Sequence, residues 1–234
     1  MDSKIPDWLS VEQLVDAGEH RALYPYPLLG NIRSASECRT CALNETEAFE
    51  EEFGRDLVQP LYNLLWRLNT IGDIFTSHTS VSPLDRKSPF EWAKAFIGSS
   101  MLIMTRDQQG RHSLQAAQGR AGMLARVLAG SKVVPTDTTG WQIRLFPTTV
   151  NLAYQTGLGT PDGNIIIPQG NEERTGFAHE IVITGSAGNR RRAAERWARA
   201  ITFVCETLEH LPEHAPYQHF EILNGKRVVP GTRG

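Results

Sequence analysis

Hydrophobic residues recur at steps of three and four along two long stretches of the chain, which is the spacing of one face of an α-helix. The first stretch runs from Asp56 to Phe75, and its apolar stripe is Leu57, Leu61, Leu64, Leu65, Leu68, Ile71 and Phe75. The second runs from about Asn189 to Leu211, with a stripe of Ala193, Ala194, Trp197, Ile201, Val204, Cys205 and Leu208. A third helix is expected from Ser113 to Ala129, before Gly130. Each stripe predicts a helix with one buried face.

Short apolar runs and alternating patterns predict strands in the second half. Residues 100–104 form a short apolar run with a small residue at its start, as in a buried strand. From Trp141 to Phe146, apolar residues alternate with Gln142 and Arg144, which is the period of a strand with one buried face. Further extended segments are predicted at residues 133–134, 165–167, 177–184, 217–223 and 226–229.

Three other segments carry local signals. The polar stretch 76–87 predicts a loop. The sequence Ser88-Pro89-Phe90-Glu91 combines a cap, a first-turn proline and a reciprocal glutamate, and so predicts a short helix that ends at Ile97. Residues 148–155 are interpreted as one or two helical turns.

Together these elements predict an α/β (mixed α+β) protein, in which a mainly helical N-terminal part precedes a mixed sheet covered by helices. The division would fall at residues 1–97 and 98–234. One continuous domain fits the same pattern.

Composition narrows the class of protein. The chain has 234 residues, 40% of them hydrophobic, which is enough for a full core, and its formal net charge of −2 argues against general nucleic-acid binding. No apolar run approaches the roughly 20 residues that cross a bilayer, and the first residues do not resemble a targeting signal. The three cysteines are an odd number, which favours a reducing compartment. We therefore expect a cytoplasmic protein without a membrane span.

Cysteine and histidine spacing does not indicate a metal site. Cys38 and Cys41 form a single CxxC, and no second pair completes a tetrahedral zinc site. His179 and Glu180 lie together in a predicted strand, where they would suit acid–base chemistry, although a structural histidine explains the same residue. We expect neither a metal nor a cofactor.

The turn before the last long helix is a candidate anion site. Gly185 and Ser186 lead into Arg190, Arg191 and Arg192, where free backbone amides and the helix dipole favour an anion. Arginines in a first turn oppose that dipole, and a bound phosphate would resolve the conflict. The alternatives are arginines paired with neighbouring glutamates, or Ser186 as a weak nucleophile elbow in which Thr184 replaces the usual glycine.

A second polar cluster follows the strand that starts at Trp141. Arg144, Thr148 and Thr149 would lie near a strand end, where open α/β sheets bind ligands, although Thr148 also suits a helix cap. Trp141 or Tyr154 would stack on a base.

The segment Trp141–Val150 resembles the strand that leads into the ligand-proximal Pro-Thr-Thr of STING-type cyclic-nucleotide sensors, and also the strand before the ligand-binding turn of SAVED-type domains. The layout of residues 201–223 is similar to the end of a STING-type domain. The chain departs from that pattern at residues 156–184, which add two candidate strands, and it lacks the membrane or TIR partner of a STING-type effector. The resemblance implies a homodimer that clamps a cyclic dinucleotide in anti-phage signalling.

These observations favour a protein that binds a phosphate-bearing small ligand, such as a nucleotide signal, without chemistry of its own. Two other classes stay open. One is a hydrolase or nuclease that uses Ser186, or His179 with Glu180. The other is a structural or assembly protein of a phage or virus.

Overall fold

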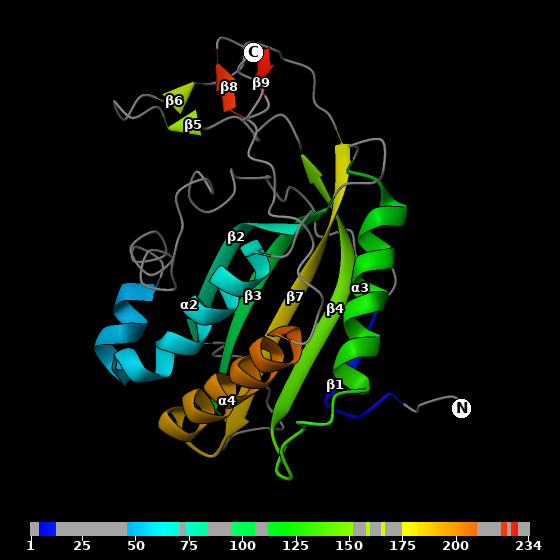
Figure 1. The fold of residues 1–234 in the computed structure, drawn as a ribbon. Coiled ribbons are helices and arrows are strands. Elements are labelled where there is room, and N and C mark those ends of the chain that lie inside the picture. Colours follow the sequence, from blue (N-terminus) through cyan, green and yellow to red (C-terminus); the bar gives the residue numbers. More distant parts are fainter. Residues whose placement is uncertain are drawn as a thin grey trace.

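A five-stranded mixed sheet forms the centre of the molecule (Figure 1). The computed structural model describes residues 5–12, 46–70, 74–83, 95–105, 112–151, 158–159, 165–166, 175–209, 221–223 and 226–228. Across the sheet the strands are β1 (Leu9–Val11), β4 (Trp141–Asn151), β7 (Thr175–Ala187), β3 (Ala95–Thr105) and β2 (Ile74–Pro83). Only β1 and β4 run parallel; the other neighbours are antiparallel. The predicted α/β class with a mixed sheet is therefore confirmed.

Four of these strands belong to two successive β-β-α units. In the first, β2 and β3 are followed by α3 (Leu114–Ala129), and in the second, β4 and β7 are followed by α4 (Arg190–Glu209). The two units meet where β3 pairs with β7, at the middle of the sheet. Helix α2 (Arg55–Thr70) precedes the first unit. Two small two-stranded sheets pair β5 (Leu158–Gly159) with β6 (Ile165–Ile166) and β8 (Glu221–Leu223) with β9 (Lys226–Val228).

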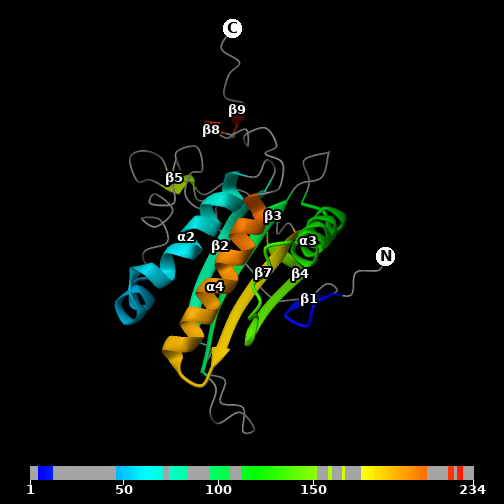
Figure 2. The ribbon, with the colours of Figure 1, turned by 60° about the horizontal axis from the view of Figure 1, so that its bottom comes forward.

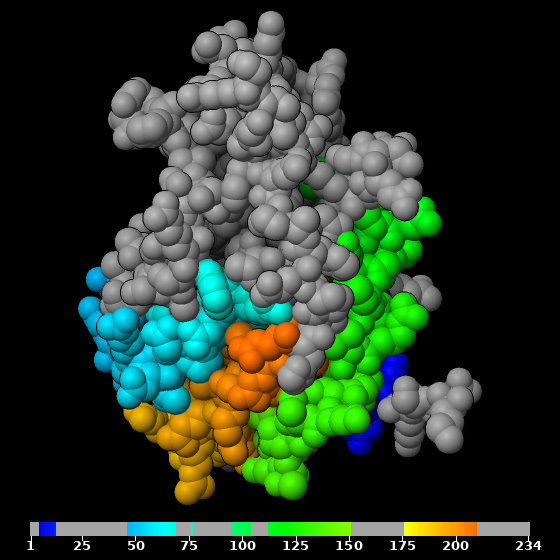
Figure 3. Space-filling view, viewed as in Figure 1, coloured from blue at the N-terminus to red at the C-terminus, as the bar shows by residue number. Residues whose placement is uncertain are grey.

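Helices α2, α3 and α4 all lie on one face of the five-stranded sheet (Figures 1 and 2). Helix α4 packs on β7 and β3, α3 packs on β4 and β7, and α2 packs on β2 and against α4. Figure 3 shows the surfaces of α2, in cyan, and α4, in orange, in direct contact. No helix in the described part of the chain covers the opposite face, which we call the helix-free face.

The core lies between the sheet and the helices and takes residues from both halves of the chain. The leucine stripe of α2 is buried, with Leu61, Leu64, Leu65 and Leu68 at most 1% exposed. It belongs to the same cluster as Trp197 of α4 and Ile183 of β7. The boundary suggested by sequence at residue 97 falls inside β3, so the described residues on either side of it share one core.

Two glycines allow close packing beside α4. A β-carbon at Gly185 would lie 2.3 Å from the backbone nitrogen of Trp197, so β7 and α4 touch through main-chain atoms there. Gly140 precedes β4 with φ 77°, a left-handed conformation that favours glycine, and a β-carbon at this position would lie 2.3 Å from the carbonyl oxygen of Ser186.

The helices α3 and α4 both begin at a side-chain cap. The Ser113 hydroxyl accepts a hydrogen bond from the Ala116 amide at 3.2 Å, and α3 ends at Gly130, which confirms the helix expected there. At the start of α4 the Asn189 side chain accepts from the Arg192 amide at 2.8 Å. The helix expected over 189–211 is confirmed as Arg190–Glu209.

Several local assignments between these helices were wrong. Helix α2 ends at Thr70, and the expected loop at 76–87 is mostly β2, a polar edge strand whose pairing with β3 has no local signature. Ile97 lies in β3 and not in a helix, while residues 88–94 of that predicted helix lie outside the described residues. Residues 133–134 form no strand.

Strand β4 also continues past its predicted end, so residues 148–151 are extended and not helical. Pro147 is tolerated within it because β1 pairs only with residues 143–145, which leaves that side of β4 without a partner strand in the described chain at Pro147.

Candidate functional site

The ligand-binding residues predicted on β4 and β7 divide between the two faces of the sheet. Successive strand residues point to opposite faces, and the pairing of β4 with β7 is uninterrupted. Arg144, Thr148 and Ser186 therefore lie on the helix-free face, whereas Trp141, Thr149 and Gly185 face the helices. Tyr154 lies outside the described residues.

Trp141 is a core residue. It is 6% exposed, and its ring lies 5.8 Å from that of Phe203 in a tilted arrangement. A ring in this position is not open to a nucleobase, so base stacking does not fall to Trp141. Seven strand positions separate Trp141 from Thr148, about 23 Å at the usual rise of a strand. The predicted set therefore does not converge on one site.

The arginines at the start of α4 have protein partners. Arg190 forms an ion pair with Glu52 at 2.7 Å. Arg191 forms one with Glu195 at 3.2 Å and donates to the carbonyl oxygen of Phe53 at 3.1 Å. Two guanidinium groups thus dock the helical segment 46–53 onto α4, which accounts for arginines in this first turn without a ligand. Phosphate binding at this turn stays a prediction.

Ser186 is also engaged locally. Its hydroxyl donates to the carbonyl oxygen of Gly140 at 3.2 Å, and its own carbonyl oxygen accepts from Arg196 at 2.6 Å. No histidine appears among these partners, and the Thr184-Gly185-Ser186 segment belongs to strand β7 itself. The Ser186 hydroxyl therefore links the turn that precedes β4 to the last residues of β7.

His179 and Glu180 are adjacent on β7 and so point to opposite faces. His179 lies in the core at 2% exposure, and burial lowers its pKa to about 3, so the imidazole is neutral at pH 7. Its Nδ1 atom has no hydrogen-bond partner. Glu180 lies on the helix-free face, where it accepts a hydrogen bond from the Ser100 hydroxyl. The two side chains therefore do not meet on one face as an acid–base pair.

Arg144 belongs to an ion-paired cluster on the helix-free face. Its guanidinium donates to both carboxylate oxygens of Glu12, at 2.6 and 2.9 Å, and lies 5.4 Å from the ring centre of Phe146. The hydrogen bond from Arg144 lowers the pKa of Glu12, and the same bond raises the pKa of Arg144, with a smaller contribution from Glu180. One arginine between two carboxylates does not favour a phosphate.

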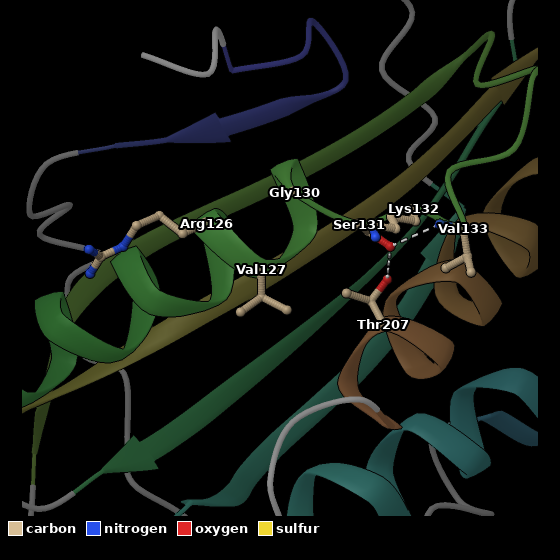
Figure 4. A pocket seen from close by; sticks show the side chains of 7 residues that line it. All are labelled: Arg126, Val127, Gly130, Ser131, Lys132, Val133 and Thr207. Carbon is tan, nitrogen blue, oxygen red and sulfur yellow. Dashed lines mark hydrogen bonds between the residues drawn. The ribbon is translucent and has the colours of Figure 1, made fainter. Parts of the chain in front are cut away.

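A hollow lies between the end of α3 and the last turns of α4 (Figure 4). Its volume is about 500 Å³, and its lining consists of Arg126, Val127, Gly130, Ser131, Lys132, Val133 and Thr207. The hydroxyl groups of Ser131 and Thr207 are hydrogen-bonded at 3.1 Å, and the Val133 amide donates to the Ser131 hydroxyl at 3.4 Å. These contacts join the loop after α3 to α4.

The hollow combines a cation with hydroxyl groups and an apolar wall. Lys132 is exposed and forms no ion pair with any described residue. Figure 4 shows the Arg126 side chain directed away from the Ser131 and Thr207 pair, and its Nε donates to the carbonyl oxygen of Gly122 at 3.3 Å. Val127 and Val133 add apolar surface. Such a lining can bind an anionic group but contains no pair of groups for acid–base catalysis.

None of these lining residues was a predicted site residue. Ser131 and Thr207 are 76 positions apart, and only the packing of α3 against α4 brings them together. The one available signal was Lys132 directly after a helix-ending glycine and serine.

Within the described ranges, no group of three or more histidine, cysteine, aspartate or glutamate residues could hold a metal ion. Cys38 and Cys41 lie outside those ranges, and Cys205 is buried as expected from its place on the α4 stripe. No helix in the described part combines the length and apolarity that a membrane crossing requires.

Comparisons with protein-family models, curated proteins and solved structures found no match to this chain.

Proposed function

We propose that this protein binds a phosphate-bearing small ligand without chemical turnover, and that the hollow between α3 and α4 holds the ligand. The observation that supports this most directly is Lys132, whose ammonium group forms no ion pair with a described residue and lies in the same hollow as the Ser131 and Thr207 hydroxyls. The volume of about 500 Å³ lies in the range of small-molecule sites.

The lining suits the two chemical parts of such a ligand. Lys132 is a donor for phosphate oxygens, and so is the Ser131 hydroxyl when Thr207 donates in the bond between the two hydroxyls. A charge-assisted contact such as that of Lys132 is stronger than a neutral one. Val127 and Val133 offer apolar contact to a sugar or base. Nucleotides, including the cyclic nucleotides implied by the sequence resemblance, are the class we would test first.

The start of α4 is the rival anion site, and a matched pair of variants distinguishes the two. Lys132→Gln removes the cation of the hollow. Arg192→Gln removes a cation at the start of α4 that forms no ion pair with a described side chain, so neither change breaks an observed contact. Both variants lose one positive charge, which controls for the general effect of net charge on anion binding.

The experiment is a thermal-shift titration with inorganic phosphate, sulfate and a panel of linear and cyclic nucleotides. We expect wild type and Arg192→Gln to be stabilised alike, and affinity to fall about tenfold or more in Lys132→Gln, as loss of a charge-assisted contact of roughly 1.5–3 kcal/mol implies. Loss of binding only in Arg192→Gln would move the site to α4 and refute the hollow. No stabilisation by any of these anions would refute phosphate binding altogether.

Incubation of the same nucleotides with the protein, followed by chromatography, tests the enzymatic alternative. We expect every nucleotide to be recovered intact. Turnover that Ser186→Ala abolishes would instead favour a hydrolase or nuclease.

A further inference from the structure

Strand β2 forms one edge of the sheet over its whole length. It spans Ile74–Pro83 and pairs with β3 alone among the described strands. A bulge lies near its start, between Thr76 and His78, and the pairing from His78 to Pro83 is regular. An edge strand offers every second pair of backbone amide and carbonyl groups to another strand. The regular part of β2 is therefore a template for strand addition.

The two sheet edges differ in how they discourage such pairing. Strand β1, at the opposite edge, has only three residues and is followed by Glu12, so it is short and ends in a charge. Strand β2 has ten residues and contains no lysine, arginine, aspartate or glutamate. Its single proline, Pro83, stands at the last position. Apart from the bulge near its start and the proline at its end, β2 therefore has neither the shortness nor the charge that protects β1.

An uncharged strand is suited to pairing with a copy of itself. In a two-fold antiparallel pair, each residue faces a residue of the same strand, so any charge near the axis would face its own copy at close range. Residues 79–82 are Thr, Ser, Val and Ser, which bring no such repulsion, and threonine and valine favour strands.

Helix α2 packs on β2. Its side chains Gln59, Asn63 and Trp66 are uncharged and at least partly exposed, whereas Arg55 and Asp56 in its first turn are exposed and charged. A second copy of this chain would therefore meet an uncharged strand at this edge of the sheet.

We infer that β2 pairs antiparallel with β2 of a second copy, which joins two sheets into one continuous ten-stranded sheet in a symmetric homodimer. This inference concerns a surface separate from the hollow, and its outcome is independent of phosphate binding.

The test compares wild type with Ser80→Lys, which places two like charges near the two-fold axis. Val11→Lys is the matched control, because it adds the same charge to the other edge of the sheet, where Val11 is 40% exposed. Sedimentation velocity over a dilution series measures the dimer dissociation constant, and circular dichroism checks that each variant is folded. We expect a dimer for wild type and Val11→Lys, and a dissociation constant at least about tenfold higher for Ser80→Lys.

Hydrogen exchange supplies a second readout that needs no substitution. Within residues 78–83, the amides that are not bonded to β3 should exchange faster when wild type is diluted below its dissociation constant, while those of β7 should not change. A wild type that stays monomeric at high micromolar concentration would overturn the inference. So would a folded Ser80→Lys variant with an unchanged dimer, or protection in β2 that does not depend on protein concentration.

Discussion

Acidification from about pH 8 to about pH 5 is expected to destabilise the protein through His179 by about 2 kcal/mol. Burial on β7 holds the pKa of His179 at about 3, against an ordinary value of 6.5. In the folded protein the His179 imidazole therefore stays unprotonated at pH 5, whereas in the unfolded chain the same imidazole binds a proton. Because the folded pKa is the lower one, the contribution of His179 is complete above pH 6.5 and is lost as the pH falls towards 3.

Urea unfolding at both pH values measures this effect, and His179→Phe isolates it. The variant removes the titrating group, so its loss of stability on acidification should be smaller than that of wild type by the same amount of about 2 kcal/mol, whatever the substitution does to stability at pH 8. Burial is the main cause of the lowered pKa and the charge of Arg120 a lesser one, so added salt should change the difference little. Equal pH dependence in the two proteins would show that the imidazole reaches solvent or a partner in the folded state.

Three further outcomes follow from the packing. Leu65→Ala should lower the unfolding free energy by roughly 2–5 kcal/mol in urea titrations, and a change within about 0.5 kcal/mol would contradict the burial of the α2 stripe. Gly185→Ala should lower the unfolding free energy by roughly 1–3 kcal/mol or more, because a β-carbon at this position meets backbone atoms of α4. A melting temperature equal to that of wild type would contradict the close approach of β7 and α4. A double-mutant cycle of Arg190→Ala with Glu52→Ala should give a coupling of only roughly 0.2–1 kcal/mol, because both side chains are nearly half exposed; a much larger value would show that segment 46–53 depends on this pair.

Helices were the part of the fold that the sequence specified well. The cap at Ser113, the glycine at 130 and the leucine stripe of α2 are signals that lie within a few residues of each other, so they can be identified without the rest of the chain. Their ends were less certain, since Phe75 continued the helical spacing of α2 but belongs to β2.

Strand β2 shows why the edge of the sheet was missed. Half of its residues are serine and threonine, which also occur in loops, and only the pairing of Ser80 with Ser100 and its neighbours makes the segment a strand. Such pairing depends on residues far away in sequence, and a polar edge strand carries no hydrophobic alternation to reveal it.

The candidate site was harder to predict from the sequence than the strands. Alternation along β4 already separated Trp141 from Arg144, but only the position of the helices shows which face is covered. The hollow depends on the contact between Ser131 and Thr207, which no local pattern signals. Residue types led to the proposal of a phosphate-bearing ligand, and the tertiary structure led to the proposed place for it.

The packing of α2 against α4 also matters while the chain is being synthesised. Helix α4 begins at Arg190, 120 positions after Thr70, the last residue of α2. At typical rates of translation this separation takes roughly 6–24 s, during which the leucine stripe of α2 has no α4 to cover it. A nascent chain in this interval presents an apolar surface of the kind that chaperones bind. Ribosomes stalled before codon 190 should therefore carry a protease-sensitive, chaperone-associated chain, and release of the full-length protein should end both properties.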